Sequence, residues 1–490
     1  MQVILNSPGY SYDVHSLVKA FYPGMNVSVT TDANDHKSSG CMSVFVSSGD
    51  IGKDMKVSGI VRITVPSEDS VITREGSYAD ATRADVKNLL KRLIYEALSE
   101  KTGMSLPWGT MTGIRPTKVP MKMLCEGSSE SGIADYMKSV YLCSDEKIRL
   151  ATDIAKREMK VTKSLSKDGF CLYIGIPFCP TRCLYCSFTS YPITSWNERT
   201  ADYIAALKKE LDFFSDYYKG RKCDCVYIGG GTPTTLSASQ LSDLISYVGD
   251  RFDVSDLKEF TVEAGRPDSI TEEKMSALKE GKVTRISVNP QTMNDKTLKI
   301  IGRRHSPDDV YRAFSIARKA GFDNINTDLI LGLPGEDDSD VKYTFDRIRE
   351  LSPDSITVHS MAIKRAAGMH AFLEEHKDIR SVNTSKMMDT ASDTAASLGL
   401  VPYYLYRQKN MAGNFENVGF ARKNRLGIYN IAIMEEVSDI AAAGCGTISK
   451  RIFDNNRIER VDTVKDVSLY IDRIDDMIER KRKLFCENNI

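Results

Sequence analysis

The sequence has no surplus of charge of either sign and no long uncharged apolar run. Lys and Arg together number 66, as do Asp and Glu, so the formal net charge is zero. This balance gives no basic footprint for nucleic acid or for an anionic membrane. A membrane-spanning run of about 18 apolar residues is missing, and so is a basic segment leading into an apolar core after Met1. We therefore predict a cytoplasmic protein with no nucleic-acid partner and no integral membrane segment.

Cysteine and histidine pairs at zinc-binding spacing are also missing. A structural zinc site usually takes its four ligands as two pairs separated by a longer stretch, and no such second pair follows the first cysteines. The 11 cysteines are scattered and odd in number, which argues for a reducing compartment rather than a disulfide framework. With 490 residues, 41% hydrophobic and 27% charged, the composition is otherwise that of a globular protein with two or three domains.

Three cysteines do lie close together, directly after an apolar, β-prone run at 171–176. They are Cys179, Cys183 and Cys186, spaced by three and then two intervening residues. A four-iron four-sulfur cluster usually takes four cysteines, so a cluster held by three leaves one iron open to another ligand. The spacing is typical of radical S-adenosylmethionine (SAM) enzymes, whose open iron chelates the amino and carboxylate groups of SAM. The alternative is a set of buried reduced thiols.

The chain falls into three predicted domains. Residues 1–165 form an α+β accessory domain, with strands at 1–5, 25–30, 42–47 and 59–65 and a helix at 81–101. It contains a loop punctuated by Gly and Pro, in which Trp108 and Arg115 either pack or contact a ligand. The polar stretch 156–167 predicts a connection between domains. Residues 166–365 form the core, and residues 366–490 form a C-terminal domain that covers the substrate.

The core alternates short apolar strands with helical stretches. We predict strands at 172–176, 224–228, 259–263, 285–289, 324–331 and 355–359, separated by helices at 199–218, 239–251, 272–280, 307–320 and 337–350. This βα alternation is typical of a wound parallel sheet or a barrel. In barrels, the chemistry lies at the C-terminal ends of the strands.

Polar residues follow several of these strands. Gly229-Gly-Gly-Thr-Pro-Thr234 follows the second strand, and its glycines let backbone approach a ligand closely. It lacks the lysine of a phosphate-binding loop, so we expect it to face the aminoacyl end of SAM. Four polar residues follow: Glu263 ends the third strand, Gln291 comes after the fourth, Arg303 lies beyond the next turn, and Asp328 lies within the fifth strand. SAM presents an ammonium, a carboxylate and a ribose diol, which such groups bind. Taken singly, each is more often a structural polar group.

Several motifs together resemble the oxygen-independent coproporphyrinogen III oxidase family of radical SAM proteins. They are Tyr173-x-x-Ile-Pro-Phe-Cys with the cysteine triplet, the Gly-Gly-Gly-Thr-Pro-Thr segment, Thr261-Val-Glu-Ala, Asn289-Pro-Gln and Asp328-Leu-Ile-Leu-Gly-Leu-Pro334. The segment Trp108-Gly-Thr-Met-Thr-Gly-Ile-Arg-Pro-Thr-Lys118 and Tyr406-Arg-Gln-Lys-Asn-Met411 resemble the coproporphyrinogen dehydrogenase branch. The resemblance covers residues 170–450 and, more weakly, the N-terminal region.

The resemblance implies a fold, a ligand set and two cofactors. The fold is α/β, a partial (β/α)6 radical SAM barrel with an N-terminal α+β accessory domain and a C-terminal α+β extension. A [4Fe-4S] cluster is held by Cys179, Cys183 and Cys186. S-adenosyl-L-methionine is surrounded by ten residues: Tyr173, Tyr185, Gly230, Gly231, Thr232, Glu263, Gln291, Arg303, Asp328 and Ala362.

The reaction implied by the resemblance is oxidative decarboxylation of a tetrapyrrole. An electron from a low-potential donor of the flavodoxin or ferredoxin type allows SAM to be cleaved to a radical, which takes hydrogen from the β-carbon of a propionate. Loss of carbon dioxide leaves a vinyl group, and two turns convert coproporphyrinogen III to protoporphyrinogen IX. A basic and aromatic cluster is predicted either to pair with the propionates or to be the exposed face of a strand: Tyr403, Tyr404, Tyr406, Arg407 and Lys409.

One position departs from the dehydrogenase pattern. Established coproporphyrinogen dehydrogenases carry a fourth cysteine two residues after the third, where this chain has Phe188. Phenylalanine is found there in haem-chaperone relatives, but their His-Asn-x-x-Tyr-Trp segment has no counterpart here. The alternatives are therefore a haem-binding chaperone, with His359 as the candidate axial ligand, and a radical SAM enzyme acting on another tetrapyrrole. A buried, hydrogen-bonded histidine is the structural alternative for His359.

Overall fold

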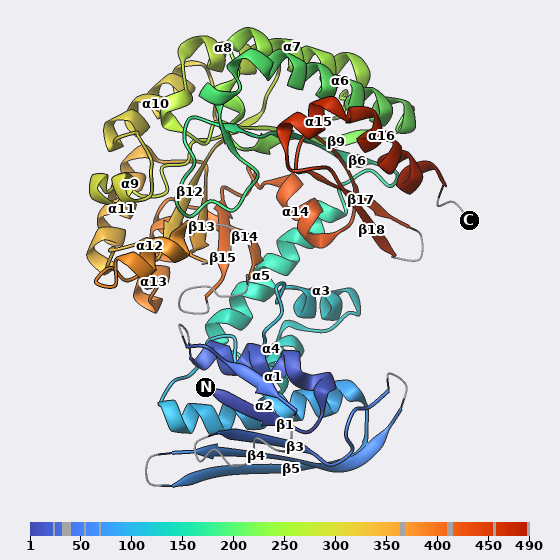
Figure 1. The fold of residues 1–490 in the computed structure, drawn as a ribbon, viewed down its shortest axis with the longest axis vertical. Helices are drawn as coiled ribbons and strands as arrows, with labels where there is room; N and C mark the ends of the chain where they lie inside the picture. The colour runs from blue at the N-terminus through green and yellow to red at the C-terminus, as the bar shows by residue number, and fades with distance from the viewer. Residues whose placement is uncertain are drawn as a thin grey trace. The chain divides into compact units, whose positions relative to one another are not determined.

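The computed structural model describes residues 1–22, 25–31, 41–52, 55–67, 70–362, 368–408, 415–453 and 457–487. The chain divides into two compact units (Figure 1). The first comprises Met1–Lys156 and Leu405–Glu416, and the second comprises Arg157–Tyr404 and Asn417–Ile490. No helix among the described residues is both long and apolar enough to cross a membrane.

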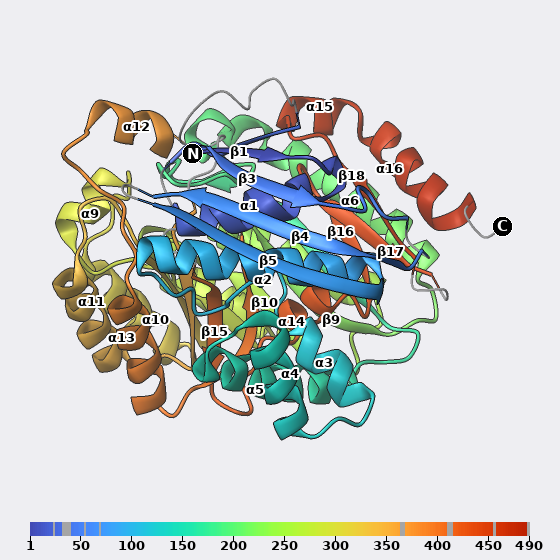
Figure 2. The same ribbon diagram turned by 90° about the horizontal axis from the view of Figure 1, so that it is seen from below.

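The first unit contains a five-stranded sheet with the strand order β2-β1-β3-β4-β5. Its strands are β1 (Gln2–Leu5), β2 (Ser28–Thr30), β3 (Met42–Val46), β4 (Val57–Pro66) and β5 (Val71–Ala81). Helices α1 (Ser11–Phe21) and α2 (Arg83–Thr102) supply the buried residues that form a core with this sheet (Figure 2). The four predicted strands are confirmed. The prediction missed β5, because most of its residues are polar or exposed.

Three further helices complete the first unit: α3 (Lys118–Cys125), α4 (Glu130–Tyr141) and α5 (Asp145–Thr162). The boundary between the units falls after Lys156, inside α5, so much of the predicted connection at 156–167 is helical. The loop containing Trp108 packs against the inserted segment Leu405–Glu416. Trp108 is 1% exposed and donates from Nε1 to Glu416 Oε2 at 2.7 Å.

The basic and aromatic cluster predicted to pair with propionates is not an exposed face. Tyr403 and Tyr404 are buried, and Arg407 is 6% exposed and donates to the Met111 carbonyl at 2.6 Å. Lys409 lies outside the described residues. The physical reason is packing, because the Arg407 guanidinium and the Arg407 amide both donate to main-chain carbonyls inside the first unit.

The second unit is built on an 11-stranded sheet with the order β14-β15-β13-β12-β11-β10-β9-β6-β16-β17-β18. Six parallel strands lie side by side in chain order: β6 (Phe170–Ile176), β9 (Cys223–Gly230), β10 (Glu259–Glu263), β11 (Arg285–Ser287), β12 (Ile325–Leu331) and β13 (Ser355–Ser360). The six predicted core strands are confirmed to within two residues at each end. Sequential parallel pairing brings their C-terminal ends to one edge of the sheet.

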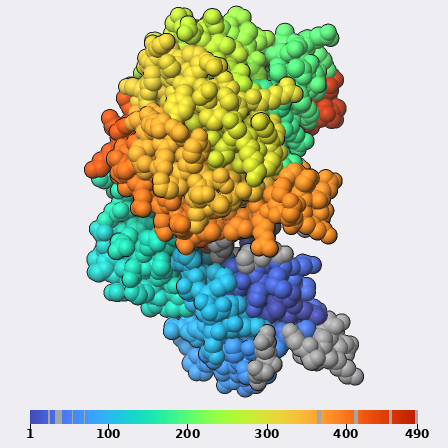
Figure 3. Space-filling view, turned by 90° about the vertical axis from the view of Figure 1, so that its left-hand side faces the viewer, coloured from blue at the N-terminus to red at the C-terminus, as the bar shows by residue number. Residues whose placement is uncertain are grey.

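The helices between these strands lie along the outside of the curved sheet (Figure 1). They are α6 (Thr200–Tyr217), α7 (Ala238–Arg251), α8 (Glu272–Glu280), α9 (Asp295–Ile300), α10 (Pro307–Lys319) and α11 (Asp338–Leu351). The capping boxes at Ser237, Ser306 and Asp337 fix where three of them begin. The prediction missed only the short α9. On the face shown in Figure 3, much of the surface of this unit is coloured yellow to orange, the range that includes α9 to α13.

The C-terminal part of the chain extends both edges of the same sheet. Strands β14 (Val401–Tyr406) and β15 (Asn417–Ala421) lie beyond β13, while β16 (Asp439–Ala443), β17 (Ile448–Ile452) and β18 (Ile458–Asp462) lie beyond β6. The helices here are α12 (Met369–Glu375), α13 (Ser385–Ser397), α14 (Ile428–Glu435), α15 (Val467–Asp472) and α16 (Ile474–Arg482), and a π-helical turn (Lys483–Glu487) follows. That this segment covers a substrate stays a prediction.

A buried ion pair fastens α16 to α6 and to the end of β16. Lys481 and Glu210 are both fully buried, with Nζ and Oε1 2.5 Å apart. Glu210 Oε2 accepts from the Tyr470 hydroxyl at 2.6 Å and from the Gly444 amide at 2.7 Å. Lys481 also donates to the Ala442 carbonyl. Every charge in this group therefore has a hydrogen-bonded partner.

We predict that Lys481→Ala destabilises the second unit by about 3–5 kcal/mol, because it leaves the Glu210 carboxylate buried without its counter-ion. Lys209→Ala is the matched control, since Lys209 joins the same two helices through an exposed pair with Asp475 at 3.0 Å. Exposed pairs contribute about 0–1 kcal/mol. Urea unfolding measures both variants. Equal midpoints for the two would contradict the assigned role of the buried pair.

Candidate cluster and cofactor site

The three clustered cysteines lie on a loop (residues 177–190, the cysteine loop) that follows β6. Cys179 ends the short strand β7 (Phe178–Cys179), which pairs in parallel with β8 (Tyr191–Pro192) on the far side of the loop. In the middle of the loop, Leu184 and Tyr185 pack against an apolar cluster at the strand ends that consists of Leu298, Ile301, Ile330, Leu333, Met361 and Met369. The loop is therefore held at its ends and at its centre.

Hydrogen bonds join the cysteine loop to the segment before Arg303. The Leu184 amide donates to the Ile301 carbonyl at 3.0 Å, and the Thr181 hydroxyl donates to the Gly302 carbonyl at 3.0 Å. This segment follows α9, which lies between β11 and β12. The contacts bring Cys183 next to residues more than 100 positions later in the sequence.

The predicted glycine segment, residues 229–234, contacts the cysteine loop on its other side. The Gly231 amide donates to the Ile176 carbonyl at 2.8 Å, and the Thr232 amide donates to the Phe178 carbonyl at 2.7 Å. The Thr232 hydroxyl lies 3.4 Å from Cys179 Sγ. Gly230 has φ +106°, and a Cβ on Gly231 would lie 2.6 Å from the Phe178 carbonyl oxygen. Glycine is thus required here by the close approach of two backbones.

The three thiols suit a cluster better than a single ion. All three cysteines are partly buried and unoxidised. Among the described residues, no group of three His, Cys, Asp or Glu side chains converges to hold one metal ion. A four-iron cluster binds each thiolate to a different iron, so its ligands need not converge. Burial raises the pKa of Cys179 to about 11 and also raises that of Cys186, and iron binding would displace those protons.

Arg303 lies at this site, and its guanidinium donates hydrogen bonds to other groups of the protein. It is 8% exposed, and its Nη1 donates to the carbonyls of Asn289 at 2.5 Å and Gly265 at 3.3 Å. Its Nη2 donates to the Tyr185 hydroxyl at 3.0 Å. Its Nε is buried without a hydrogen-bond partner among the described residues. The guanidinium therefore links the loops after β10 and β11 to the cysteine loop.

Glu263 ends β10 beneath the glycine segment. The Tyr227 hydroxyl donates to Glu263 Oε1 at 2.6 Å, and burial raises the pKa of this carboxyl to about 7. A Cβ on Gly229 would lie 2.9 Å from Glu263 Cδ. Tyr227 also stacks on Tyr173 and Tyr429, with ring centroids 5.9 and 4.6 Å away. Sequence reasoning missed Tyr227 and Tyr429, although Tyr227 lies two positions before Gly229 and so shares its face of the strand.

Gln291, four residues after the end of β11, lies beside Asp328, which is in the middle of β12. The Gln291 amide donates to the Asp328 carbonyl at 3.1 Å, and Gln291 has φ +71°, a strained value for a residue other than glycine. Its side-chain Oε1 is buried without a hydrogen-bond partner among the described residues. Asp328 accepts from Asn326 Nδ2 at 2.7 Å, and His359 Nε2 lies 3.9 Å from its other oxygen. The side-chain oxygen of Gln291, which has no partner among the described residues, and the Asp328 carboxylate could therefore bind a polar ligand.

Ala362, the last of the predicted cofactor residues, lies two positions beyond the end of β13. The preceding amide, that of Met361, donates to the Leu331 carbonyl at 2.8 Å, which keeps this segment at the strand ends. Sequence reasoning also missed Arg266, which follows β10 and contacts the cysteine loop. Its signal was its place three residues after Glu263, in the turn that follows a core strand.

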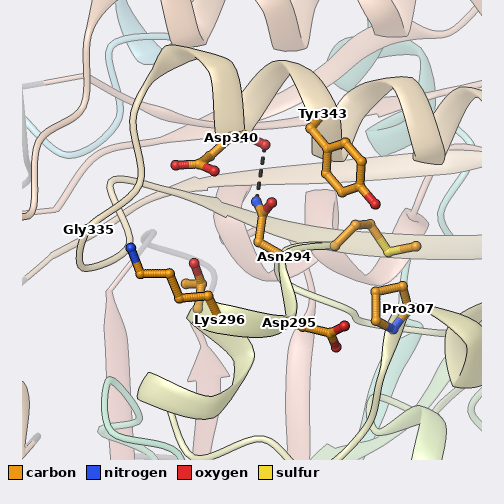
Figure 4. Close-up of a pocket in the computed structure, with 9 residues that line it drawn as sticks. Asn294, Asp295, Lys296, Pro307, Gly335, Asp340 and Tyr343 are labelled. Atoms are coloured by element: carbon orange, nitrogen blue, oxygen red, sulfur yellow. Dashed lines mark hydrogen bonds between the residues drawn. The ribbon is translucent and has the colours of Figure 1, made fainter.

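A cavity of about 250 Å³ lies elsewhere in this unit, at the starts of α9 and α11 (Figure 4). It is lined by Met293, Asn294, Asp295, Lys296, Thr297, Pro307, Gly335, Asp340 and Tyr343. Asn294 Nδ2 donates to the Asp340 carbonyl at 3.1 Å across it. None of the predicted site residues lines this cavity, so it is separate from the cysteine loop.

The fold and the cysteine loop define the class of protein. Residues 173–348 match the family model described as the radical SAM superfamily. Among solved structures, the chain resembles coproporphyrinogen III oxidase (HemN) from Escherichia coli, a radical SAM enzyme, with a TM-score of 0.50 and 21% identity over 65% of this chain and 72% of that one. This likeness shows a mixed α/β radical SAM fold, to which the chain adds the N-terminal sheet.

Sequence comparison narrows the class. The chain is 40% identical over 404 residues to the oxygen-independent coproporphyrinogen-III oxidase-like protein HemZ of Bacillus subtilis. This match covers 81% of each of the two chains. It therefore belongs to the oxygen-independent coproporphyrinogen-III oxidase-like family of radical SAM enzymes. It is also 38% identical over 195 residues to the haem chaperone HemW of Bacillus subtilis, which covers 39% of this chain and 50% of that relative.

We predict that Gly231→Ala destabilises the second unit by about 1–3 kcal/mol, because the added Cβ meets fixed backbone oxygens. Gly249→Ala is the control, since Gly249 lies in α7 and nothing lies within 4 Å of its added Cβ. There, loss of a helical glycine should stabilise the protein by about 0.5–1 kcal/mol. Urea unfolding followed by circular dichroism measures both. A Gly231→Ala protein as stable as the parent would show that the two backbones are not held together.

Proposed function

We propose that the cysteine loop holds a [4Fe-4S] cluster through Cys179, Cys183 and Cys186, and that SAM lies between this cluster and the strand ends. Three observations support this fit. The donor set is three free, partly buried thiols on one loop. Glycine backbone without side chains lies beside Cys179. Gln291 Oε1 is buried without a hydrogen-bond partner among the described residues, and the Gln291 backbone contacts that of Asp328. When bound, the cluster and SAM supply one-electron cleavage to a carbon radical that can take hydrogen from a substrate.

In this proposal the strand ends bind the polar groups of SAM. Asp328 and Glu263 offer carboxylates to hydroxyl or cationic groups, and Gln291 offers an amide. Above pH 7 Glu263 is mostly ionised, given its pKa of about 7. Arg303 holds Tyr185 and the loop carbonyls in place, so its influence on SAM acts at least partly through the loops it joins.

We propose oxidative decarboxylation of the propionates of coproporphyrinogen III to vinyl groups as the reaction, with a low-potential one-electron donor. The observation that carries this proposal is the likeness to HemZ, which extends over 81% of the chain and is not confined to the radical SAM core. HemZ itself is named as oxidase-like, and HemN, whose name states the activity, shares the fold.

A haem-binding carrier is the second candidate. Phe188 stands where established dehydrogenases have a cysteine, and on the cysteine loop this residue is 68% exposed. The chain also shares 38% identity with a haem chaperone, but only over 39% of its length. His359, the candidate axial ligand, is the partner of Asp328 at 3.9 Å. A haem iron would have to compete with that carboxylate for the imidazole.

The ligand assignment predicts that Cys179→Ala, Cys183→Ala and Cys186→Ala each abolish the brown absorbance and SAM cleavage, because each thiolate is individually required to hold iron. Cys223→Ala and Cys225→Ala are controls, since both thiols are buried in β9 away from the loop. Iron analysis and detection of 5′-deoxyadenosine after anaerobic reconstitution measure the outcome. A triplet variant that keeps both properties would remove that cysteine from the ligand set.

The proposed reaction predicts that anaerobic incubation with coproporphyrinogen III, SAM and a reductant removes two carboxyl groups and forms about two 5′-deoxyadenosine per porphyrinogen, one radical per propionate. Mass spectrometry of the tetrapyrrole measures the loss. Intact coproporphyrinogen together with stoichiometric haem binding, altered in His359→Ala, would support the carrier instead. A mass change other than loss of carbon dioxide would indicate another tetrapyrrole reaction.

A further inference from the structure

Arg266 is a buried guanidinium that the proposed reaction does not use. It follows β10 and is 2% exposed. Its Nε and Nη2 each donate to one carboxylate oxygen of Asp268 at 3.0 Å, which makes a bidentate pair. Arginine is permanently protonated, and a bidentate carboxylate fixes the plane of its guanidinium. Removing a charge from water costs free energy. The remaining contacts of Arg266 therefore indicate what the buried charge does.

The remaining nitrogen of Arg266 points at the cysteine loop. Its Nη1 donates to the Thr181 carbonyl at 3.2 Å and to the Thr181 hydroxyl at 3.0 Å. The same nitrogen lies 3.9 Å from Cys183 Sγ, within range of a hydrogen bond to sulfur. In the structure this sulfur is a free thiol, and it stands in for the thiolate that would bind iron. One side chain thus holds the backbone before Cys183 and reaches its sulfur.

Arg303 makes the positive charge around Cys183 larger, since it interacts with the same sulfur. The buried His305 lies near both arginines. Burial, and then the charges of Arg303 and Arg266, lower the pKa of His305 to about 3. The imidazole is therefore neutral at physiological pH, and Asp268, the partner of Arg266, offsets part of the charge of the two guanidiniums.

We propose that Arg266 is a positioning residue that fixes the Cys183 end of the cysteine loop and raises the reduction potential of the cluster held there. The inference rests on the proposed function, because it requires the cluster. Hydrogen bonds to cluster sulfurs and nearby charge are known determinants of the potential. Reduction adds one electron from the donor to the cluster and no proton. A fixed positive charge in a poorly solvated site stabilises the product of that step.

The test is a potentiometric titration of the reconstituted full-length protein without SAM, with dithionite as the electron source and electron paramagnetic resonance as the readout. In Arg266→Gln we expect the ratio of reduced to oxidised cluster, at the midpoint potential of the parent, to fall about tenfold. For a one-electron couple this is a shift of about 59 mV to lower potential. Arg318→Gln is the matched control, because Arg318 also pairs with an aspartate, Asp354, at 2.7 Å and also bonds main-chain carbonyls.

Asp268→Asn should shift the reduction potential of the cluster in the opposite direction, to higher potential. It leaves Arg266 in place but removes the carboxylate that offsets its charge, so we expect the reduced-to-oxidised ratio to rise about threefold. A role confined to loop packing predicts no such pair of opposite shifts. If Arg266→Gln does not retain iron, Asp268→Asn still decides, and a potential equal to that of the parent would overturn the inference.

Failure of the inference and failure of the proposed function give different results. A parent protein that binds no iron–sulfur cluster after anaerobic reconstitution would refute the function and the inference together. A parent protein that has a cluster and cleaves SAM, while Arg266→Gln and Asp268→Asn titrate at the parent potential, would refute the inference alone.

Discussion

The arrangement of the site depends on how the cysteine loop is fastened to the C-terminal edge of the parallel sheet. The loop is not a regular element, and hydrogen bonds hold it on both sides. On one side the Gly231 and Thr232 amides donate to the Ile176 and Phe178 carbonyls, and on the other the Leu184 amide and the Thr181 hydroxyl donate to the Ile301 and Gly302 carbonyls. Parallel pairing in chain order is what brings these segments to one edge. Without this pairing, Cys183 and Arg303, which are far apart in the sequence, would not lie close together.

The second constraint is charge burial at this edge. The guanidiniums of Arg266 and Arg303 are withdrawn from water beside the cysteine loop, and His305, which has no hydrogen-bond partner among the described residues, lies near them. Buried charges are tolerated where each finds a fixed partner, as Arg266 does in Asp268. Gln291 is different, because its strained backbone and unpartnered oxygen have no structural compensation within the described residues. Such strain is typical of sites that bind a ligand.

Much of the core could be predicted from sequence because its signals are local. Apolar strands and amphipathic helices alternate from 170 to 360, and strand and helix limits there agree with the structure to within two residues. The hydrogen-bond partners of the polar side chains could not be predicted. Arg303 looked like a partner for a ligand carboxylate, yet it bonds main-chain carbonyls of loops far apart in sequence. For Arg407 the alternative of an exposed face was wrong, because the residue is buried and donates to the Met111 carbonyl. Strand β5 was missed because an exposed strand carries no apolar alternation.

The central claim is that three cysteines hold a four-iron cluster with one iron open to SAM. Mössbauer spectroscopy of anaerobically reconstituted, ⁵⁷Fe-labelled protein, recorded with and without SAM, tests it most directly. The account predicts one [4Fe-4S] cluster per chain in which a single iron changes its parameters when SAM is added, since SAM would ligate only that iron. Four irons whose parameters do not respond to SAM, or a protein that assembles no such cluster, would contradict it.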